Sequence, residues 1–451
     1  MMGDMVSEET RTMSATPVRS SAGTGTETES ETPATRAWMT RLVVVAIVLT
    51  ALNLRPAITS LGALLEEVRD GLGMSGSVAG LLTSVPPLCF AVFGVMAPRL
   101  ARRFGAGAVV CAGMVAIATG LAIRPYAWNT AGFLAATALA LMGIAVSNVL
   151  MPVIVKSWFP ERVGSMTGLY SMALALGTAA AAAVTVPMTG ALGGGWRAGL
   201  VVWAGLAAVA VLPWIPLAGV RGADESARRG SSVPGARGPS GYGASGQDPQ
   251  VPDGLRIIRS RTAWALAVFF GLQATAAYIT MGWMAQIFRD AGVAAGTAGL
   301  LLAVTMVMGV PLAFVIPRLA TRLPHQGPIV VALGVCGLAG YAGLYLDPAG
   351  GAWAWALLLG VSNCAFPLAL TMVGMRARTG AGVAKLSAFA QSAGYLISIP
   401  GPLLVGVLYQ HSGGWGLPLA LMAGLMIPQI GVGILAGRDR TVEDEAARRT
   451  V

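Results

Sequence analysis

Long apolar stretches alternate with short polar segments along most of the chain. Each stretch approaches or exceeds the roughly 20 residues that a helix needs to cross a bilayer. The twelve candidate spans cover residues 41–65, 76–97, 107–124, 130–156, 164–191, 196–217, 262–287, 294–316, 328–346, 352–375, 383–408 and 415–436. The pattern predicts an all-α integral membrane protein with 12 transmembrane helices.

Composition supports a membrane protein and argues against several other classes. The chain has 451 residues, of which 55% are hydrophobic and 11% charged, whereas soluble proteins carry about 25% charged residues. The net charge of +10 does not indicate nucleic-acid binding, because the basic residues lie between spans and set membrane orientation. The four cysteines and two histidines show no metal-ligand spacing. We expect no cofactor, no metal and no enzymatic activity.

Polar, low-complexity segments divide the chain into regions. Residues 1–39 predict a disordered cytoplasmic tail. Residues 218–259 are rich in Gly, Ser and Pro and predict a flexible cytoplasmic linker. The remaining regions are an N-terminal six-helix bundle at 40–217, a C-terminal six-helix bundle at 260–436 and a cytoplasmic tail at 437–451.

Basic residues predict the orientation of the spans. Lys and Arg are more frequent in the loops that share a side with the N-terminus than in the opposite loops. Because basic loops stay inside, both termini are expected in the cytoplasm of a multi-pass cell-membrane protein. The opposite loops hold Arg69, Arg124, Arg197 and Arg289, and the acidic pair Glu66 and Glu67 is expected at their solvated rim.

An internal repeat organises the spans into two halves. The sequence AGLL at 79–82 recurs at 298–301, and PRLA at 98–101 recurs at 317–320, both at an offset of 219 residues. A one-residue shift aligns Asn53 with Gln273. Two pseudo-symmetric halves in the same orientation are typical of carriers that bind substrate near the midplane and rock one half against the other.

The first span contains a charged residue and a proline near its middle. Arg55 lies roughly 20 Å from the start of the helix at about 1.5 Å per residue, where a guanidinium costs about 2.5–3.5 kcal/mol. Pro56 follows it and frees the carbonyl of Leu52 from its helical hydrogen bond. We interpret Arg55 as the anchor of an anion or polar-substrate site. The alternative is a packing or gating cation held by backbone carbonyls.

Other polar residues inside the spans are further candidates for substrate binding. Asn53 and Gln273 are symmetry mates and are expected to supply hydrogen bonds. Asn148 and Asn363 also correspond, and each lies four residues before a proline. Tyr278 is a candidate for stacking on a planar ligand. For Asn148 and Asn363 the alternative is an interhelical hydrogen bond, and for Tyr278 it is core packing.

The loop between spans two and three resembles the major facilitator signature G-x-x-x-D-R-x-G-R-R. The matching residues, with the second-half counterparts of two of them, are Gly94, Arg99, Arg102, Arg103, Arg318 and Arg322. Pro98 replaces the usual Asp and Ala101 the second Gly, so the charge relay that the family's Asp supplies is not expected here. The alternative is that these arginines act only as positive-inside charge.

The run N-L-R-P-A-I-T-S at 53–60 is similar to the first span of the cyanate/nitroimidazole (CynX/NimT) transporter family within the major facilitator superfamily. The resemblance implies movement of cyanate-like small anions or of nitroimidazoles. Members differ in substrate and direction, so the resemblance fixes neither.

These features together predict a secondary active transporter that moves a small anion or compact polar organic molecule by alternating access. Its expected partners are a small-molecule substrate, the lipid bilayer and a coupling proton or counter-ion, and it is expected to be monomeric. The first alternative is a drug or metabolite efflux pump in which Arg55 is structural. A membrane enzyme or sensor is the second alternative, and the sequence shows neither clustered catalytic groups nor a signalling domain.

Overall fold

A computed structural model of the protein describes residues 33–159, 161–218 and 257–447. The chain divides into two compact units, Met1–Met39 and Thr40–Val451, and the description below concerns the second. Most of the predicted tail at 1–39, most of the linker at 218–259 and the last four residues of the chain lie outside the described residues.

The predicted fold class is confirmed, because the described residues form helices and no strands. The first half contains α1 (Pro33–Asn53), α2 (Pro56–Ala63), α3 (Leu65–Leu72), α4 (Gly76–Phe104), α5 (Ala106–Ile123), η1 (Arg124–Tyr126), α6 (Thr130–Trp158), α7 (Val163–Ala191) and α8 (Trp196–Val211). The second half contains η2 (Ile257–Arg259), α10 (Arg261–Asp290), α11 (Ala295–Val307), α12 (Gly309–Arg322), α13 (Gly327–Leu346), α14 (Ala352–Ser362), α15 (Ala365–Met375), α16 (Gly380–Ser398), α17 (Pro400–Ser412) and α18 (Gly416–Ala436), followed by α19 (Val442–Ala447).

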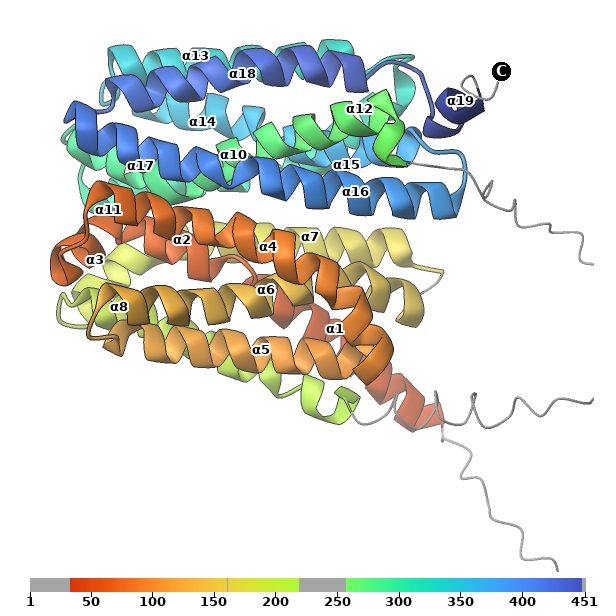
Figure 1. Ribbon diagram of the computed structural model, residues 1–451. Helices are drawn as coiled ribbons and strands as arrows, with labels where there is room; N and C mark the ends of the chain where they lie inside the picture. The colour runs from red at the N-terminus through yellow and green to blue at the C-terminus, as the bar shows by residue number, and fades with distance from the viewer. Residues whose placement is uncertain (1–32, 160, 219–256, 448–451) are drawn as a thin grey trace, which may run out of the picture. The chain divides into compact units, whose positions relative to one another are not determined.

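Twelve membrane spans result from these helices. Eleven helical segments of the described chain are long and apolar enough to cross a membrane, and the shorter apolar helix α8 supplies the twelfth. The first six and the last six spans form the two halves, which lie one above the other in Figure 1.

Several spans consist of two helices rather than one. The first is broken between α1 and α2, as Pro56 predicts. Span ten is broken between α14 and α15, where Pro367 cannot donate to the carbonyl of Asn363 four residues earlier. Further breaks separate α11 from α12 at Met308 and α16 from α17 at Ile399, which hydropathy alone does not indicate.

Helix α10 runs from one end of the bundle to the other and defines the two ends. Near its start, the Glu445 carboxylate of α19 accepts hydrogen bonds from Ser260 and Thr262. Near its finish, Arg289 pairs with Glu67 of α3. We therefore name these the α19 end and the α3 end, which lie to the right and left in Figure 1.

The halves pack closely on each other toward the α3 end. A Cβ atom added at Gly62 of α2 would lie 2.0 Å from the carbonyl oxygen of Met281 on α10. Gly80 of α4 likewise approaches Leu403 and Gly406 of α17, where a Cβ would meet backbone atoms at 2.9–3.1 Å. Helix α7 packs extensively on α11 but only sparsely on α12, which continues toward the α19 end. The two halves are therefore joined at one end and less tightly packed at the other.

Candidate functional site

Arg55 lies in the break of the first span. Its backbone has φ −122° and ψ −27°, between the end of α1 and the first residue of α2, Pro56. The Arg55 carbonyl accepts hydrogen bonds from the backbone N–H groups of Ile58 at 2.9 Å and Thr59 at 3.1 Å, and so begins α2. The break therefore fixes the backbone that carries the guanidinium in the middle of the span.

The freed carbonyl of Leu52 faces a glycine on a neighbouring helix. A Cβ atom added at Gly177 of α7 would lie 2.3 Å from the Leu52 oxygen. Only a residue without a side chain fits at this distance. The proline and the glycine together allow α7 to pack directly on the broken turn.

The Arg55 side chain is half-buried among aromatic rings. Its Cζ atom lies 6.0 Å from the centroid of Phe90, and Tyr278 lines the same cavity as Arg55. Tyr170 and Tyr395 lie close enough to interact electrostatically with the guanidinium. None of the ion pairs formed by the described residues involves Arg55. A cation at this depth without a carboxylate partner is suited to an anionic ligand.

A cavity of about 380 Å³ lies beside Arg55. Its walls come from α7 in the first half and from α10, α11, α12, α15 and α16 in the second. The lining extends from Arg55 and Met281 at mid-depth to Pro317 and Thr371, which lie nearer the α19 end. Within the described part of the chain, Arg55 is the only charged residue that lines it. The volume lies in the range of small-molecule sites, about 300–1,000 Å³.

Gln273 and Asn363 line the cavity together, as the sequence predicts for substrate-binding residues, but they also bind each other. Gln273 Nε2 donates to the side-chain and backbone oxygens of Asn363, each at 3.1 Å. Gln429 of α18 donates to Gln273 Oε1 at 3.3 Å. The backbone oxygen of Asn363 is the one to which Pro367 cannot donate, and it also accepts from the Phe366 N–H at 3.2 Å. This amide network thus holds the broken span ten against α10.

The structure places two predicted site residues away from the cavity. Asn53 is 1% exposed, and its Nδ2 donates to the carbonyl of Leu49 at 2.8 Å and of Leu206 on α8 at 3.4 Å. Asn53 is the last residue of α1 and Arg55 lies in the break that follows, so the two side chains belong to differently oriented backbone. Asn148 accepts a hydrogen bond from Tyr170 and does not line the cavity. Both residues thus make hydrogen bonds between helices, the alternative that the sequence left open for Asn148 but not for Asn53.

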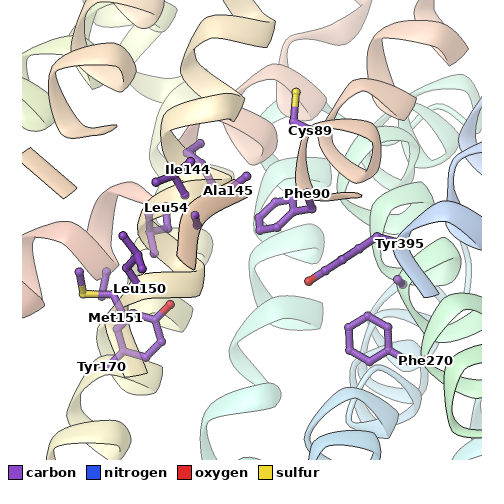
Figure 2. Close-up of a cluster of buried hydrophobic side chains, with 14 of the residues drawn as sticks. Leu54, Cys89, Phe90, Ile144, Ala145, Leu150, Met151, Tyr170, Phe270 and Tyr395 are labelled. Carbon is purple, nitrogen blue, oxygen red and sulfur yellow. The ribbon is translucent and has the colours of Figure 1, made fainter. Parts of the chain in front are cut away.

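Aromatic side chains form one wall of the cavity. Tyr278, Phe366 and Tyr395 line it. The Tyr395 ring stacks on Phe90 at 5.0 Å between centroids and meets the edge of Phe270 at 5.2 Å. Figure 2 shows Phe90, Tyr395 and Phe270 grouped together, with the Tyr395 hydroxyl directed toward the side of Tyr170. Sequence reasoning identified Tyr278 but missed Phe90, Phe366 and Tyr395, because single aromatic residues in apolar spans carry no distinguishing pattern.

The residues of the loop motif lie apart from this cavity. Gly94 lies within α4, where a Cβ would approach Val149 of α6 at 3.6 Å. The motif arginines are exposed, near the C-terminal ends of α4 and α12, and none forms an ion pair with another described residue. These exposed residues are Arg99, Arg102, Arg103, Arg318 and Arg322.

Two charged features depart from the expectation of solvated loops. Arg124 is fully buried, and its Nη1 donates at 2.9 Å to the carbonyl of Ala57, the second residue of α2. Glu67 does not stand free at a rim but pairs with Arg289 of the other half. In each contact the two residues are far apart in the sequence, so no local sequence pattern predicts either contact.

Two six-helix halves, with helices broken beside a cavity to which both contribute, define a membrane carrier. The Major Facilitator Superfamily profile matches residues 43–382, and the chain belongs to this family. Its secondary transporters work by alternating access.

Individual relatives agree with this assignment. The chain is 34% identical to the uncharacterized transporter YycB of Bacillus subtilis (strain 168), over 90% of this chain and 96% of that one. It is 31% identical to the 2-nitroimidazole transporter of Escherichia coli (strain K12), over 89% and 97%, and 29% identical to the cyanate transport protein CynX of the same organism, over 85% and 95%. The predicted CynX/NimT-like character is therefore confirmed.

A solved structure supports the fold. The nucleoside transporter NupG superposes with a TM-score of 0.67 at 14% identity, covering 88% of this chain and 98% of its own. This likeness concerns the fold alone.

Proposed function

We propose that the protein is a secondary active transporter that binds a small anion or a compact polar organic molecule at the cavity beside Arg55. The observation that carries the proposal is the guanidinium itself. It lines a cavity between the two halves and has no ion-pair partner among the described residues. An anionic substrate would supply the missing negative charge. The relatives named for cyanate and for 2-nitroimidazole support substrates of this size.

The binding residues proposed here differ from the sequence-based set. Arg55 supplies charge, and Tyr278 and Tyr395 supply hydroxyl groups. Gln273 and Asn363 line the cavity and shape it through their mutual hydrogen bonds. Asn53 and Asn148 are not retained as substrate contacts.

We propose that the α19 end faces the cytoplasm of a cell membrane. The exposed arginines of α4 and α12 lie near the C-terminal ends of these helices, next to loops at the α19 end. Basic residues are more frequent in cytoplasmic loops. The close packing at the α3 end and the extension of the cavity toward the α19 end then correspond to an inward-facing conformation. Rocking the halves about the cavity would expose Arg55 to the opposite side.

A second candidate is efflux of nitroimidazole-like compounds with Arg55 in a structural role. The observation that favours it is the mostly apolar lining, which includes Leu174, Met306 and Leu370. In this case transport of uncharged substrates would survive the loss of the guanidinium.

Transport by reconstituted full-length protein separates the two candidates. Labelled cyanate and 2-nitroimidazole would be offered to proteoliposomes that carry the parent, Arg55→Lys, Arg55→Gln or the exposed control Arg440→Gln. Loss of a charge-assisted contact predicts a 10- to 100-fold weaker apparent affinity for the anion in Arg55→Gln, about 1.5–3 kcal/mol, and a partial loss in Arg55→Lys. Parent-like anion transport by both folded Arg55 variants would refute the proposed site.

A further inference from the structure

The cavity places one positive charge directly beside an aromatic wall. Arg55 Cζ lies 6.0 Å from the Phe90 centroid, and the Phe90 ring stacks on Tyr395 at an interplanar angle of 28°. Tyr278 lies 6.4 Å from Phe90 and 6.5 Å from Tyr395 between centroids. Phe270 meets the Tyr395 ring at 90°, so this ring is held on two sides.

Most other polar groups of the lining are already occupied by the protein. Thr178 donates to the carbonyl of Leu174, and Thr371 donates to that of Pro367. Thr305 donates to helix carbonyls as well. Both amide hydrogens of Gln273 are directed to Asn363. The donors that remain for a ligand are therefore concentrated in Arg55, the lining tyrosines, Ser171 and the Asn363 amide group.

Charge limits the ligand further. No carboxylate lines the cavity within the described chain, so a cation would meet Arg55 without compensation. Arg55 would balance only one of the two negative charges of a dianion. The second charge would remain unpaired, and an unpaired charge in an apolar site is costly. A monoanion matches the site.

We propose that the substrate is a planar aromatic monoanion, with its carboxylate or equivalent group on Arg55 and its ring against the wall formed by Tyr278 and Tyr395. The inference rests on the proposed transport function and specifies its substrate class. Offset or edge-to-face contacts with the tyrosine rings would favour a flat ring over a saturated one. The tyrosine hydroxyls would donate to the anionic group at the margin of the ring.

A series of matched probes tests ring and charge separately on purified full-length protein. Benzoate carries both features, benzamide lacks the charge, cyclohexanecarboxylate lacks the flat ring, phthalate adds a charge, and cyanate has no ring. Competition against labelled benzoate would measure their affinities. We expect benzoate to bind about tenfold or more tightly than benzamide, and severalfold to tenfold more tightly than cyclohexanecarboxylate.

Variants assign the ring preference to the wall. Tyr395→Leu should reduce the ratio of benzoate to cyclohexanecarboxylate affinity severalfold, whereas Tyr395→Phe should keep it. Tyr345→Leu, an exposed tyrosine on α13, is the matched control. An unchanged ratio in Tyr395→Leu would overturn the aromatic assignment.

The probe series also separates this inference from the proposed function. If cyanate or cyclohexanecarboxylate binds as tightly as benzoate and still depends on Arg55, the aromatic class is wrong while anion transport stands. If no anion binds in an Arg55-dependent way, both proposals fail. Benzamide binding equal to that of benzoate would overturn the monoanion.

Discussion

Arg289 Nη1 lies 2.9 Å from both carboxylate oxygens of Glu67. Arg289 lies in the last turn of α10 in the second half, and Glu67 lies in the first turn of α3 in the first half, so this pair ties the halves together at the α3 end. Arg289 Nη2 also contacts Glu66 at 2.8 Å. Because all three side chains are partly exposed, the ion pairs are screened by water and contribute about 1 kcal/mol or less.

Neutralising this acidic pair should loosen the α3 end. In Glu66→Gln/Glu67→Gln protein we expect the halves to separate there more often, with a change of up to about fivefold in the equilibrium. The reporter is Ser77→Cys, since Ser77 donates to Gln410 of the other half. Both proteins carry Ser77→Cys in a background whose more accessible native cysteines are replaced. The rate at which a polar maleimide labels Cys at this position should be severalfold higher in the double variant than in the parent.

Asp70→Asn is the control for this experiment. Asp70 lies on the same helix α3, is exposed and forms no ion pair with a described residue. It should leave the labelling rate unchanged. Equal rates in the parent and the double variant would show that the ion pairs do not hold the halves together.

A side chain at Gly177 should destabilise the broken turn beside Arg55. The added Cβ of Gly177→Ala would lie 2.3 Å from the Leu52 oxygen, so α7 or α1 must shift. Forced packing of this kind costs about 1–3 kcal/mol. We expect a lower melting temperature in detergent, together with weaker transport.

Gly190 provides the matched control on the same helix. No atom lies within 4 Å of a Cβ added there, so Gly190→Ala should be neutral or stabilise α7 by up to about 1 kcal/mol. If Gly177→Ala unfolds at the same temperature as Gly190→Ala, the close approach to Leu52 does not constrain the turn.

Glu445 should make the docking of α19 depend on pH. Burial alone would raise the pKa of Glu445, but hydrogen bonds from Ser260 and Thr262 outweigh it and lower the pKa below its usual value of 4.5. A lowered folded-state pKa means that this stabilisation is complete above the unfolded-state pKa and is lost as pH falls through the folded-state value.

The Glu445→Gln variant tests this linkage. At pH 7 we expect it to be about 1 kcal/mol less stable than the parent, at the low end for a charged hydrogen bond because the group is partly exposed. The difference in melting temperature should shrink as pH falls below about 4.5. Glu161→Gln, at an exposed position, should show no such trend. A difference that grows in acid would contradict the assignment.

The features of this protein that depend on local chemistry could be predicted from the sequence. Hydropathy located the twelve spans, and Pro56 located the break beside Arg55, because a proline acts on the turn immediately before it. The internal repeat had identified both Gln273 and Asn363 as candidate residues, and the structure pairs them by a hydrogen bond. The break at Met308 was not predicted, although Pro311, three residues later, cannot donate to the carbonyl of Val307.

The direction of each side chain could not be predicted in this way. Asn53 and Arg55 are neighbours in sequence, yet one binds Leu206 of α8 and the other lines the cavity. Arg124 was expected in an outer loop but lies buried against Ala57. Membrane helices are apolar on all sides, so hydropathy does not reveal how each is rotated.

The sequence by itself determined a carrier of two repeated halves with a guanidinium and a broken turn inside its first span. Those properties follow from hydropathy, proline chemistry and internal repetition, each of which acts over a few residues or is read directly by alignment. Only the tertiary structure decided that Arg55 faces aromatic rings across the interface and that Glu67 meets Arg289. Such contacts join residues far apart in the chain, and the packing of whole helices selects them.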